Sequence, residues 1–192
     1  MCGRYYIAAE DSSAELQEII ADLQRRSGAD SVKLGEVRPS DHALVLTNNR
    51  KLEKRAFSIQ WGYSFPDSRP IINARSETAS SKSLFRDGML QRRCLIPASY
   101  YFEWKHQENR RIKYAIHPKG CTSIYMAGIY HLEHEIPRFV ILTRAASQDI
   151  EHIHDRMPVI LPEEMRSDWL NVKYDANEVI HAAQLNMDYR AV

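Results

Sequence analysis

Short apolar segments, separated by Pro, Gly or clusters of charged residues, dominate the middle of this sequence. They lie at residues 42–47, 55–65, 113–117, 123–130 and 138–143, and segments bounded in this way are typical of β-strands. No regular helical segments connect them, although the strand–helix units of a parallel doubly wound sheet would require such connections. We therefore expect an α+β fold with a distorted, mostly antiparallel, barrel-like β-sheet and flanking helices.

Helices are expected on either side of this strand-rich region. Near the N-terminus, Ser12 and Glu15 form a capping box and Gly28 is placed to end the helix. Between these signals, four apolar residues recur at helical spacing: Leu16, Ile19, Ile20 and Leu23. Two further helices are expected after Pro162 and from about Asn177.

Composition limits the kinds of partner and the cellular environment. The 26 Lys and Arg residues nearly balance the 25 Asp and Glu residues, so any nucleic-acid surface must be a local patch.

A chain of 192 residues suits one domain, which we expect to span residues 1–192. The sequence has no signal-peptide pattern and no apolar run that could span a bilayer. The three cysteines are an odd number and lack metal-like spacing, which favours a reducing compartment: Cys2, Cys94 and Cys121. We therefore expect a cytoplasmic protein with no membrane partner.

The second residue is a cysteine, and it becomes an N-terminal 1,2-aminothiol if Met1 is removed. The amine of such a residue condenses with an aldehyde to an imine, and the thiol then adds to the imine carbon to close a thiazolidine ring. Arg4 places a cation nearby, which is expected to favour the thiolate. The alternative is that Cys2 is a small buried apolar residue and that Arg4 is simply solvated.

Residues 71–78 resemble the end of a strand that opens into a polar segment. Asn73 has the donor and acceptor atoms to orient an amine, and Arg75 can form a fork on a phosphate. Lys82 supplies another cation shortly afterwards. The alternative is that Asn73 caps a turn and that Arg75 forms an ion pair with Glu77.

Glu103 is a single carboxylate within the aromatic run at residues 100–104. Apolar surroundings disfavour the charged form of a carboxyl group and so suit it to proton transfer. Trp104 beside it can stack on a base or a sugar. The alternative is a glutamate that faces solvent on an alternating strand.

His154 is the fourth candidate, because imidazole exchanges protons near neutral pH and the neighbouring Asp155 can orient or charge it. The nearby histidines do not have the spacing of a structural zinc site: His131, His134, His152 and His154. We therefore expect no metal and no cofactor.

Four motifs occur in order: Cys-Gly-Arg from Cys2, Asn-Ala-Arg-x-Glu-Thr from Asn73, Phe-Glu-Trp from Phe102 and Ile-His-Asp-Arg-Met-Pro from Ile153. Together, over most of the chain, they resemble the SOS-response-associated peptidase family, whose members act as abasic-site sensors on single-stranded DNA. The resemblance implies a distorted antiparallel barrel, removal of Met1, and a thiazolidine crosslink between Cys2 and the ring-opened aldehyde of an abasic deoxyribose.

The resemblance also implies roles for individual residues. Cys2 would form the crosslink, Asn73 would hold its amine and the sugar, and Glu103 would be the general acid/base. His154 would assist proton transfer and contact the backbone of the lesion. Arg75 would grip a phosphate, and six further residues would contact the strand: Arg4, Pro39, Trp61, Lys82, Trp104 and Thr143.

The implied partner is single-stranded DNA with abasic sites, bound by a monomer that associates with the bacterial nucleoid when it acts on DNA. Two segments depart from the family pattern. The loop after Trp61 lacks a tryptophan that often acts as a wedge, and the usual Asn-Val-Ala-Pro segment reads Glu36-Val37-Arg38-Pro39. We expect Arg38 to add a phosphate contact there.

Two other functions fit the same residues. Cys2 could be the nucleophile of a peptidase, with His154 as its base and autoproteolytic release of Met1. The chain could also be a single-stranded DNA-binding module in which Cys2 has no chemical role. The substrate separates the first two hypotheses, because lyase-like crosslinking needs an aldehyde whereas a peptidase needs an amide. The substitution Cys2→Ala tests the third hypothesis, because it would abolish a crosslink but leave noncovalent DNA binding nearly intact.

Overall fold

The structure is a computed structural model, and it describes residues 2–8, 13–28, 31–49, 51–65, 69–108 and 110–192. The helices in these ranges are α1 (Ala14–Ser27), α2 (Ser76–Ala79), α3 (Ser83–Gln91), α4 (Glu163–Leu170) and α5 (Ala176–His181). The strands are β1 (Arg4–Ile7), β2 (Gly35–Val37), β3 (His42–Asn48), β4 (Lys54–Trp61), β5 (Asn73–Arg75), β6 (Arg93–Ala98), β7 (Tyr100–Gln107), β8 (Arg110–Pro118), β9 (Ile124–Glu133), β10 (Ile136–Ala145), β11 (Arg156–Pro158) and β12 (Met187–Ala191).

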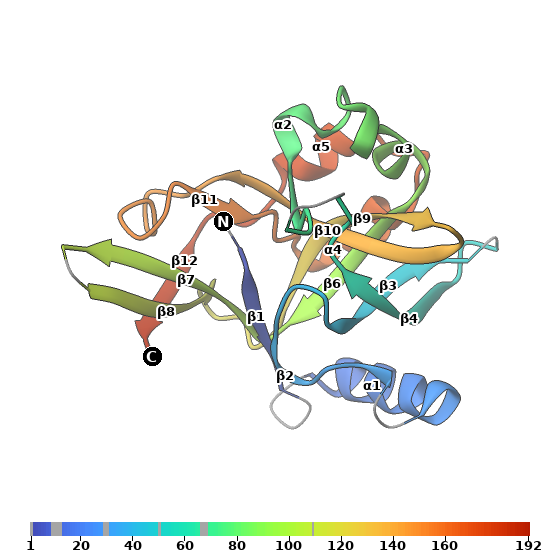
Figure 1. Cartoon of the computed structure of the whole chain (residues 1–192), viewed down its shortest axis with the longest axis horizontal. Coiled ribbons are helices and arrows are strands. Elements are labelled where there is room, and N and C mark those ends of the chain that lie inside the picture. Colours follow the sequence, from blue (N-terminus) through green and yellow to red (C-terminus); the bar gives the residue numbers. More distant parts are fainter. Residues whose placement is uncertain (1, 9–12, 29–30, 50, 66–68, 109) are drawn as a thin grey trace.

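Five of these strands close into a barrel (Figure 1). They follow the order β4, β3, β6, β9 and β10, and the ring closes because β10 pairs with both β9 and β4. The β4–β10 pairing is parallel and the other four are antiparallel. The short strands β5 and β11 also pair with β10. The predicted α+β class with a mostly antiparallel barrel is therefore confirmed.

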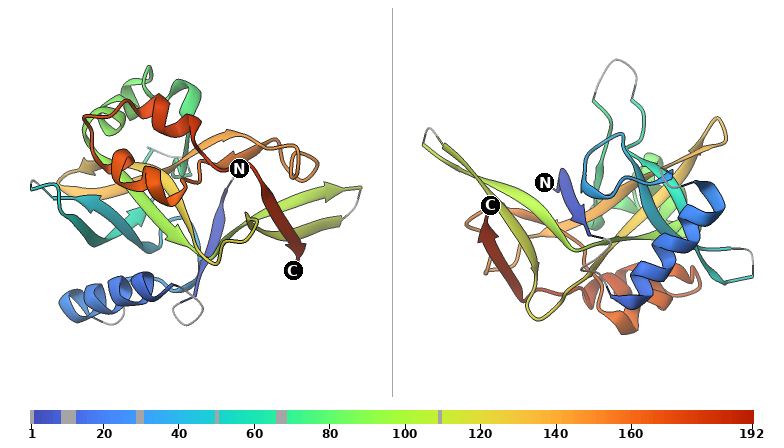
Figure 2. Two further views of the ribbon diagram at one scale, coloured as in Figure 1. Left: turned by 180° about the vertical axis from the view of Figure 1, so that it is seen from behind. Right: turned by 90° about the horizontal axis from the view of Figure 1, so that it is seen from below.

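A second sheet extends to one side of the barrel (Figures 1 and 2). It has the order β12-β8-β7-β1-β2 and is antiparallel throughout. Successive side chains of a strand point to opposite faces. Tyr5 on β1 is paired with Tyr101 on β7, and both are buried with Glu103 on the inner face. Tyr6 and Trp104 therefore lie on the outer face.

The helices cover the barrel and bury their apolar sides on it. α1 packs against β4, α3 against β9 and α4 against β6. The buried face of α1 is formed by Leu16, Ile20 and Leu23, as the helical spacing predicted. No helix in the described ranges is both long enough and apolar enough to cross a membrane.

The cap of α1 differs from the prediction. The hydroxyl of Ser13 accepts a hydrogen bond of 3.3 Å from the Leu16 amide and is the N-cap. Ser12, the predicted cap, lies outside the described residues. Glu15 forms an ion pair of 2.6 Å with Lys54 on β4. Glu15, which was predicted to complete a capping box, thus connects the helix to the barrel instead.

The other predicted elements are present, and one is shorter than expected. The apolar segments at 42–47, 113–117, 123–130 and 138–143 lie in β3, β8, β9 and β10, and the two late helices are α4 and α5. The strand predicted at 55–65 ends at Trp61. The chain turns at Gly62, whose φ of 109° favours glycine, and a Cβ there would lie 2.9 Å from Pro70.

Candidate active site

Cys2 lies just before β1, and two hydrogen bonds involve it. Its side chain is fully buried. Its thiol is 3.9 Å from the carbonyl oxygen of Arg4, and its own carbonyl oxygen accepts a hydrogen bond of 2.9 Å from the side-chain amide of Asn73. Asn73 is the first residue of β5, which pairs with β10 of the barrel. The barrel therefore fixes the backbone of Cys2 through Asn73, and the bond reaches the carbonyl group of Cys2 rather than its amine.

Glu103 adjoins Cys2 from the inner face of β7. Its side chain is only 3% exposed, so the alternative of a solvent-facing glutamate is wrong. Burial raises the pKa of the Cys2 thiol well above its usual range, and the negative charge of Glu103 raises it further. Cys2 is therefore a neutral thiol near pH 7. The expectation that Arg4 favours its thiolate is wrong.

Arg4 is engaged elsewhere. Its guanidinium donates a hydrogen bond of 3.0 Å to Glu36 on β2 and lies 5.2 Å from the centre of the Trp104 ring. The outer face of the second sheet thus holds Arg4 between a carboxylate and an indole. Its guanidinium therefore lies on this face, paired with Glu36.

Several buried polar atoms near Cys2 have no hydrogen-bond partner among the described residues. They are the carbonyl oxygen of the Asn73 side chain and the hydroxyls of Tyr5 and Tyr101. Both tyrosine side chains lie close enough to Cys2 for its charge to contribute to their raised pKa values, which burial mainly causes. Leaving such an atom unsatisfied costs roughly 1–3 kcal/mol. These three atoms can therefore take a hydrogen bond from a further group.

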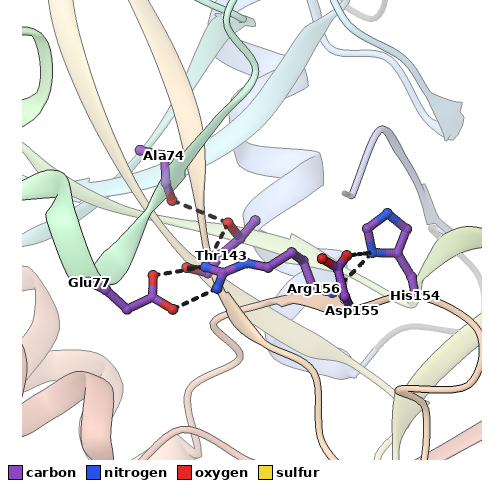
Figure 3. A network of polar contacts seen from close by, with 6 residues as sticks. All are labelled: Ala74, Glu77, Thr143, His154, Asp155 and Arg156. Atoms are coloured by element: carbon purple, nitrogen blue, oxygen red, sulfur yellow. Dashed lines mark hydrogen bonds and ion pairs between the residues drawn. The ribbon is translucent and has the colours of Figure 1, made fainter.

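The next two residues in the sequence hold the ring of His154 (Figure 3). Its Nδ1 atom lies 3.0 Å from the backbone nitrogen of Arg156 and 2.8 Å from a carboxylate oxygen of Asp155. One ring nitrogen cannot serve both contacts in the same protonation state. With a proton, Nδ1 donates to Asp155, and without one it accepts from the amide of Arg156. The two contacts therefore stabilise alternative proton positions on the ring, which suits a residue that transfers protons.

The side chain of Arg156 links this segment to α2 (Figure 3). It forms a bidentate ion pair with Glu77, with distances of 2.6 and 2.8 Å, and donates a hydrogen bond of 2.8 Å to the carbonyl oxygen of Thr143. The hydrogen bonds from Arg156 hold the pKa of Glu77 below its usual range. The carboxylate of Glu77 therefore pairs with Arg156. The alternative in which Arg75 forms an ion pair with Glu77 is wrong.

A hollow of about 390 Å³ brings four of the candidate residues together, and neither Cys2 nor Asn73 is among the residues that line it. Seven residues line it: Gly3, Arg4, Glu103, Trp104, His106, Arg111 and His154. Four of them were predicted from the sequence. His106 and Arg111 were not predicted, although they lie opposite each other on β7 and β8, and His106 shares a strand face with Trp104. The alternation along residues 102–106 is the signal that could have identified His106.

The remaining predicted DNA contacts divide into two groups. Arg75 and Lys82 are exposed and Pro39 is partly exposed, so their side chains lie at the surface. Trp61 and Thr143 are fully buried. Trp61 donates a hydrogen bond to the carbonyl oxygen of Ile72, and Thr143 donates one to that of Ala74. These two side chains support the β5 segment from inside, so the prediction that they contact DNA is wrong.

Metal binding finds no support in the described ranges, where no group of three or more His, Cys, Asp or Glu side chains could hold an ion. His131 is paired with Glu133 and stacks on Tyr63. His152 lies against Tyr189. The histidines near His154 therefore serve other contacts.

The sequence profile of a protein family described as SOS response associated peptidase (SRAP) matches residues 1–192. The chain belongs to the SRAP family. Among curated relatives of this SRAP protein, the abasic site processing protein YedK of Escherichia coli is 31% identical over 193 residues, covering 95% of this chain and 85% of that protein. The abasic site processing protein YoqW of Bacillus subtilis is 32% identical over 186 residues, covering 90% and 81%.

Solved structures share the fold of this SRAP protein. The crystal structure of a protein from Bacteroides thetaiotaomicron matches with a TM-score of 0.79 at 23% identity, covering 100% of this chain and 92% of that one. The crystal structure of a phage-related protein from Bordetella bronchiseptica matches with a TM-score of 0.75 at 24% identity, covering 100% and 94%. At this level of identity the likeness shows the fold alone.

Proposed function

We propose that this SRAP protein senses abasic sites in single-stranded DNA and, after removal of Met1, binds them covalently through a thiazolidine at Cys2. The observation that carries the proposal is the buried carboxylate of Glu103, which lies close enough to Cys2 for its charge to raise the pKa of the thiol. An acid/base group thus adjoins the residue that reacts. The relatives named abasic site processing proteins support the same substrate.

The reaction joins the amine and the thiol of Cys2 to one carbon of the sugar. The closed hemiacetal of the abasic deoxyribose first opens to an aldehyde. The amine attacks the carbonyl carbon, and loss of one water leaves an imine. The thiol then adds across the C=N bond, so that sulfur binds the carbon and the thiol proton passes to the nitrogen. The product contains both reactants less one water.

The residues around Cys2 have complementary roles in these steps. Glu103 removes the proton from the anomeric hydroxyl, returns a proton to the ring oxygen, and later protonates the carbinolamine hydroxyl, which then leaves as water. Asn73 orients the amine of Cys2, because it already holds the carbonyl group of the same residue. His154 lines the same hollow as Glu103 and assists proton transfer.

The DNA strand contacts the hollow and the surface around it. Trp104 offers an aromatic face, and Arg111 offers a cation within the hollow. Arg75, Lys82 and Pro39 lie at the surface and would contact the strand outside the hollow. Because phosphate contacts release counterions, binding should weaken as salt is added.

A peptidase is less well supported by the site. The nucleophile of a cysteine peptidase is a thiolate, whereas burial and Glu103 both raise the pKa of the Cys2 thiol. Thiazolidine formation begins at the amine and uses the thiol only after the imine has formed. The state of Cys2 therefore favours the crosslinking reaction.

The test uses protein whose N-terminus has been checked by mass spectrometry and a single-stranded oligonucleotide with one abasic site. A denaturing gel should show a heat-stable adduct with the wild type, none with Cys2→Ala, and slower formation with Glu103→Gln. The Glu103→Gln variant keeps the size of the side chain and removes its acid/base function. No adduct from wild-type protein that lacks Met1 would overturn the proposal.

A further inference from the structure

One carboxylate on the outer face of the second sheet is surrounded by three cations. Glu36 on β2 accepts hydrogen bonds from Arg4 at 3.0 Å, from Arg38 at 3.1 Å and from Lys113 at 2.6 Å. These cations come from β1, from the residue after β2 and from β8. Three separate segments therefore place positive charge around one point on the surface.

Aromatic rings hold two of these cations in place. The ammonium group of Lys113 lies 3.6 Å from the centre of the Phe102 ring and 5.7 Å from that of Trp104, and Arg4 also lies over Trp104. Contacts of this kind restrict long side chains that are otherwise flexible. The positions of Arg4 and Lys113 are thus set by β7 as well as by Glu36.

The cluster is adjacent to the candidate active site and carries excess positive charge. Arg4 and Trp104 belong both to the cluster and to the hollow that holds Glu103 and His154. One carboxylate neutralises only one of the three cations. The two oxygens of Glu36 occupy positions between guanidinium and ammonium groups, an arrangement in which the oxygens of a phosphate also bind.

We propose that Arg4, Arg38 and Lys113 form a phosphate-binding site for the DNA strand beside the lesion, and that Glu36 occupies this site as an internal counterion which the phosphate displaces. The identity of the ligand rests on the proposed function. Glu36 is held as a carboxylate, since the hydrogen bond from Lys113, together with Arg38 and Arg4, keeps its pKa below the usual range. Its charge therefore competes with phosphate at neutral pH.

An internal counterion lowers the affinity for DNA and reduces its dependence on salt. Before a phosphate binds, Arg4, Arg38 and Lys113 must separate from Glu36. The free energy needed to break these ion pairs reduces the net free energy of phosphate binding. Each additional phosphate contact on a single strand changes the slope of log affinity against log salt by about 0.7. In the wild type the displaced carboxylate of Glu36 takes up a counterion again, which offsets the release from one phosphate. Neutralising Glu36 should therefore tighten binding and steepen this slope.

The experiment measures noncovalent binding in the Cys2→Ala background by fluorescence anisotropy. The probe is a labelled single-stranded oligonucleotide that contains a tetrahydrofuran abasic analogue, titrated at several NaCl concentrations. Glu36→Gln should bind about 3- to 10-fold more tightly at about 50 mM NaCl, with a slope steeper by about 0.7. Glu53→Gln, which removes an equal charge beside Arg55 at the β3–β4 turn, should change affinity much less.

A second variant tests the site from the opposite side. Arg38 is well exposed and lies outside the hollow, so Arg38→Gln should fold normally, with an unchanged melting temperature. It should bind the probe more weakly and with a shallower salt slope. Unchanged affinity and slope in both Glu36→Gln and Arg38→Gln would overturn the phosphate site. Equal tightening in Glu36→Gln and Glu53→Gln would overturn the role of Glu36, because it would report net charge alone.

Adduct formation by protein with Cys2 intact separates this inference from the proposed function. If the adduct forms and Glu36→Gln binds no more tightly, the counterion role is wrong and the proposed function stands. If Glu36→Gln and Arg38→Gln behave as expected but no adduct forms, the phosphate site stands and the covalent function is wrong.

Discussion

The side-chain amide of Asn73 donates a hydrogen bond of 2.9 Å to the carbonyl oxygen of Cys2, although 71 positions separate the two residues in the sequence. Asn73 lies on β5, which is paired with β10, and Cys2 precedes β1 of the second sheet. This bond therefore joins the barrel to the N-terminal segment at the residue that is proposed to react.

Loss of this bond should slow crosslinking. In Asn73→Ala the carbonyl group of Cys2 loses its donor, and a hydrogen bond is worth about 1 kcal/mol, or about 5-fold in rate. Single-turnover crosslinking, measured at saturating oligonucleotide, should show this decrease while noncovalent affinity changes little. Asn73→Asp keeps the size of the side chain but removes the donor, so it should be slow as well. A wild-type rate in both variants would show that Asn73 has no orienting role.

The ion pair between Glu77 and Arg156 should influence His154 from a distance. Arg156 contributes its backbone amide to the Nδ1 atom of His154, while its side chain is fixed by Glu77 and Thr143. In Glu77→Gln, we expect slower crosslinking and a displaced pH–rate profile, because Arg156 and the imidazole are held less firmly. The melting temperature should fall only slightly, since Glu77 is half exposed. An unchanged pH–rate profile would contradict this positioning role.

Acid should remove part of the stability that Glu36 provides. Its pKa in the folded protein is lowered, chiefly by the hydrogen bond from Lys113. Its contribution is present above the ordinary glutamate pKa of about 4.3, and it is lost as the pH falls through the lowered pKa of the folded state. The free energy of unfolding of wild type and Glu36→Gln should therefore differ near pH 7 and converge as the pH falls below the ordinary glutamate pKa and through the lowered one. A difference that is constant with pH would contradict this account.

The three cysteines should differ in their reactivity toward iodoacetamide. Burial raises the pKa of both Cys2 and Cys94 and shields them from the reagent, whereas Cys121 is partly exposed. Peptide mass spectrometry of the folded protein that retains Met1 should find Cys121 alkylated first. All three should react after denaturation in urea, which serves as the control. Early alkylation of Cys2 in the folded protein would show that its thiol is more accessible and more acidic than this structure implies.

Periodic patterns predicted much of the fold. The helical spacing of Leu16, Ile20 and Leu23 identified α1, and the bounded apolar runs identified β3, β8, β9 and β10. β1 was not predicted as a strand, because Tyr5 and Tyr6 place aromatic side chains on both of its faces. β7 was considered as a strand only in the alternative for Glu103. The limit of β4 at Trp61 depends on the approach of Pro70 to Gly62, which local sequence does not reveal.

Residues that belong to the sequence motifs were predicted as site residues. Contacts with residues from distant strands could not be predicted. Asn73 donates a hydrogen bond to the carbonyl group of Cys2, and Glu103 lies close enough to raise the pKa of its thiol. Arg4 does not act on the thiol, because the carboxylate of Glu36 holds it on the outer face. The side chain of Thr143 faces the interior, and this follows from the pairing of β10 with β5 and β11 rather than from its neighbours in sequence.

The mass of the intact adduct tests the central claim most directly. Protein lacking Met1 is incubated with a single-stranded oligonucleotide that has one abasic site and is then analysed without reduction. A thiazolidine at Cys2 predicts a product equal to the sum of the two masses less one water, stable to heat and absent in Cys2→Ala. An adduct of the same mass and stability in Cys2→Ala, or no adduct with the wild type, would contradict the claim.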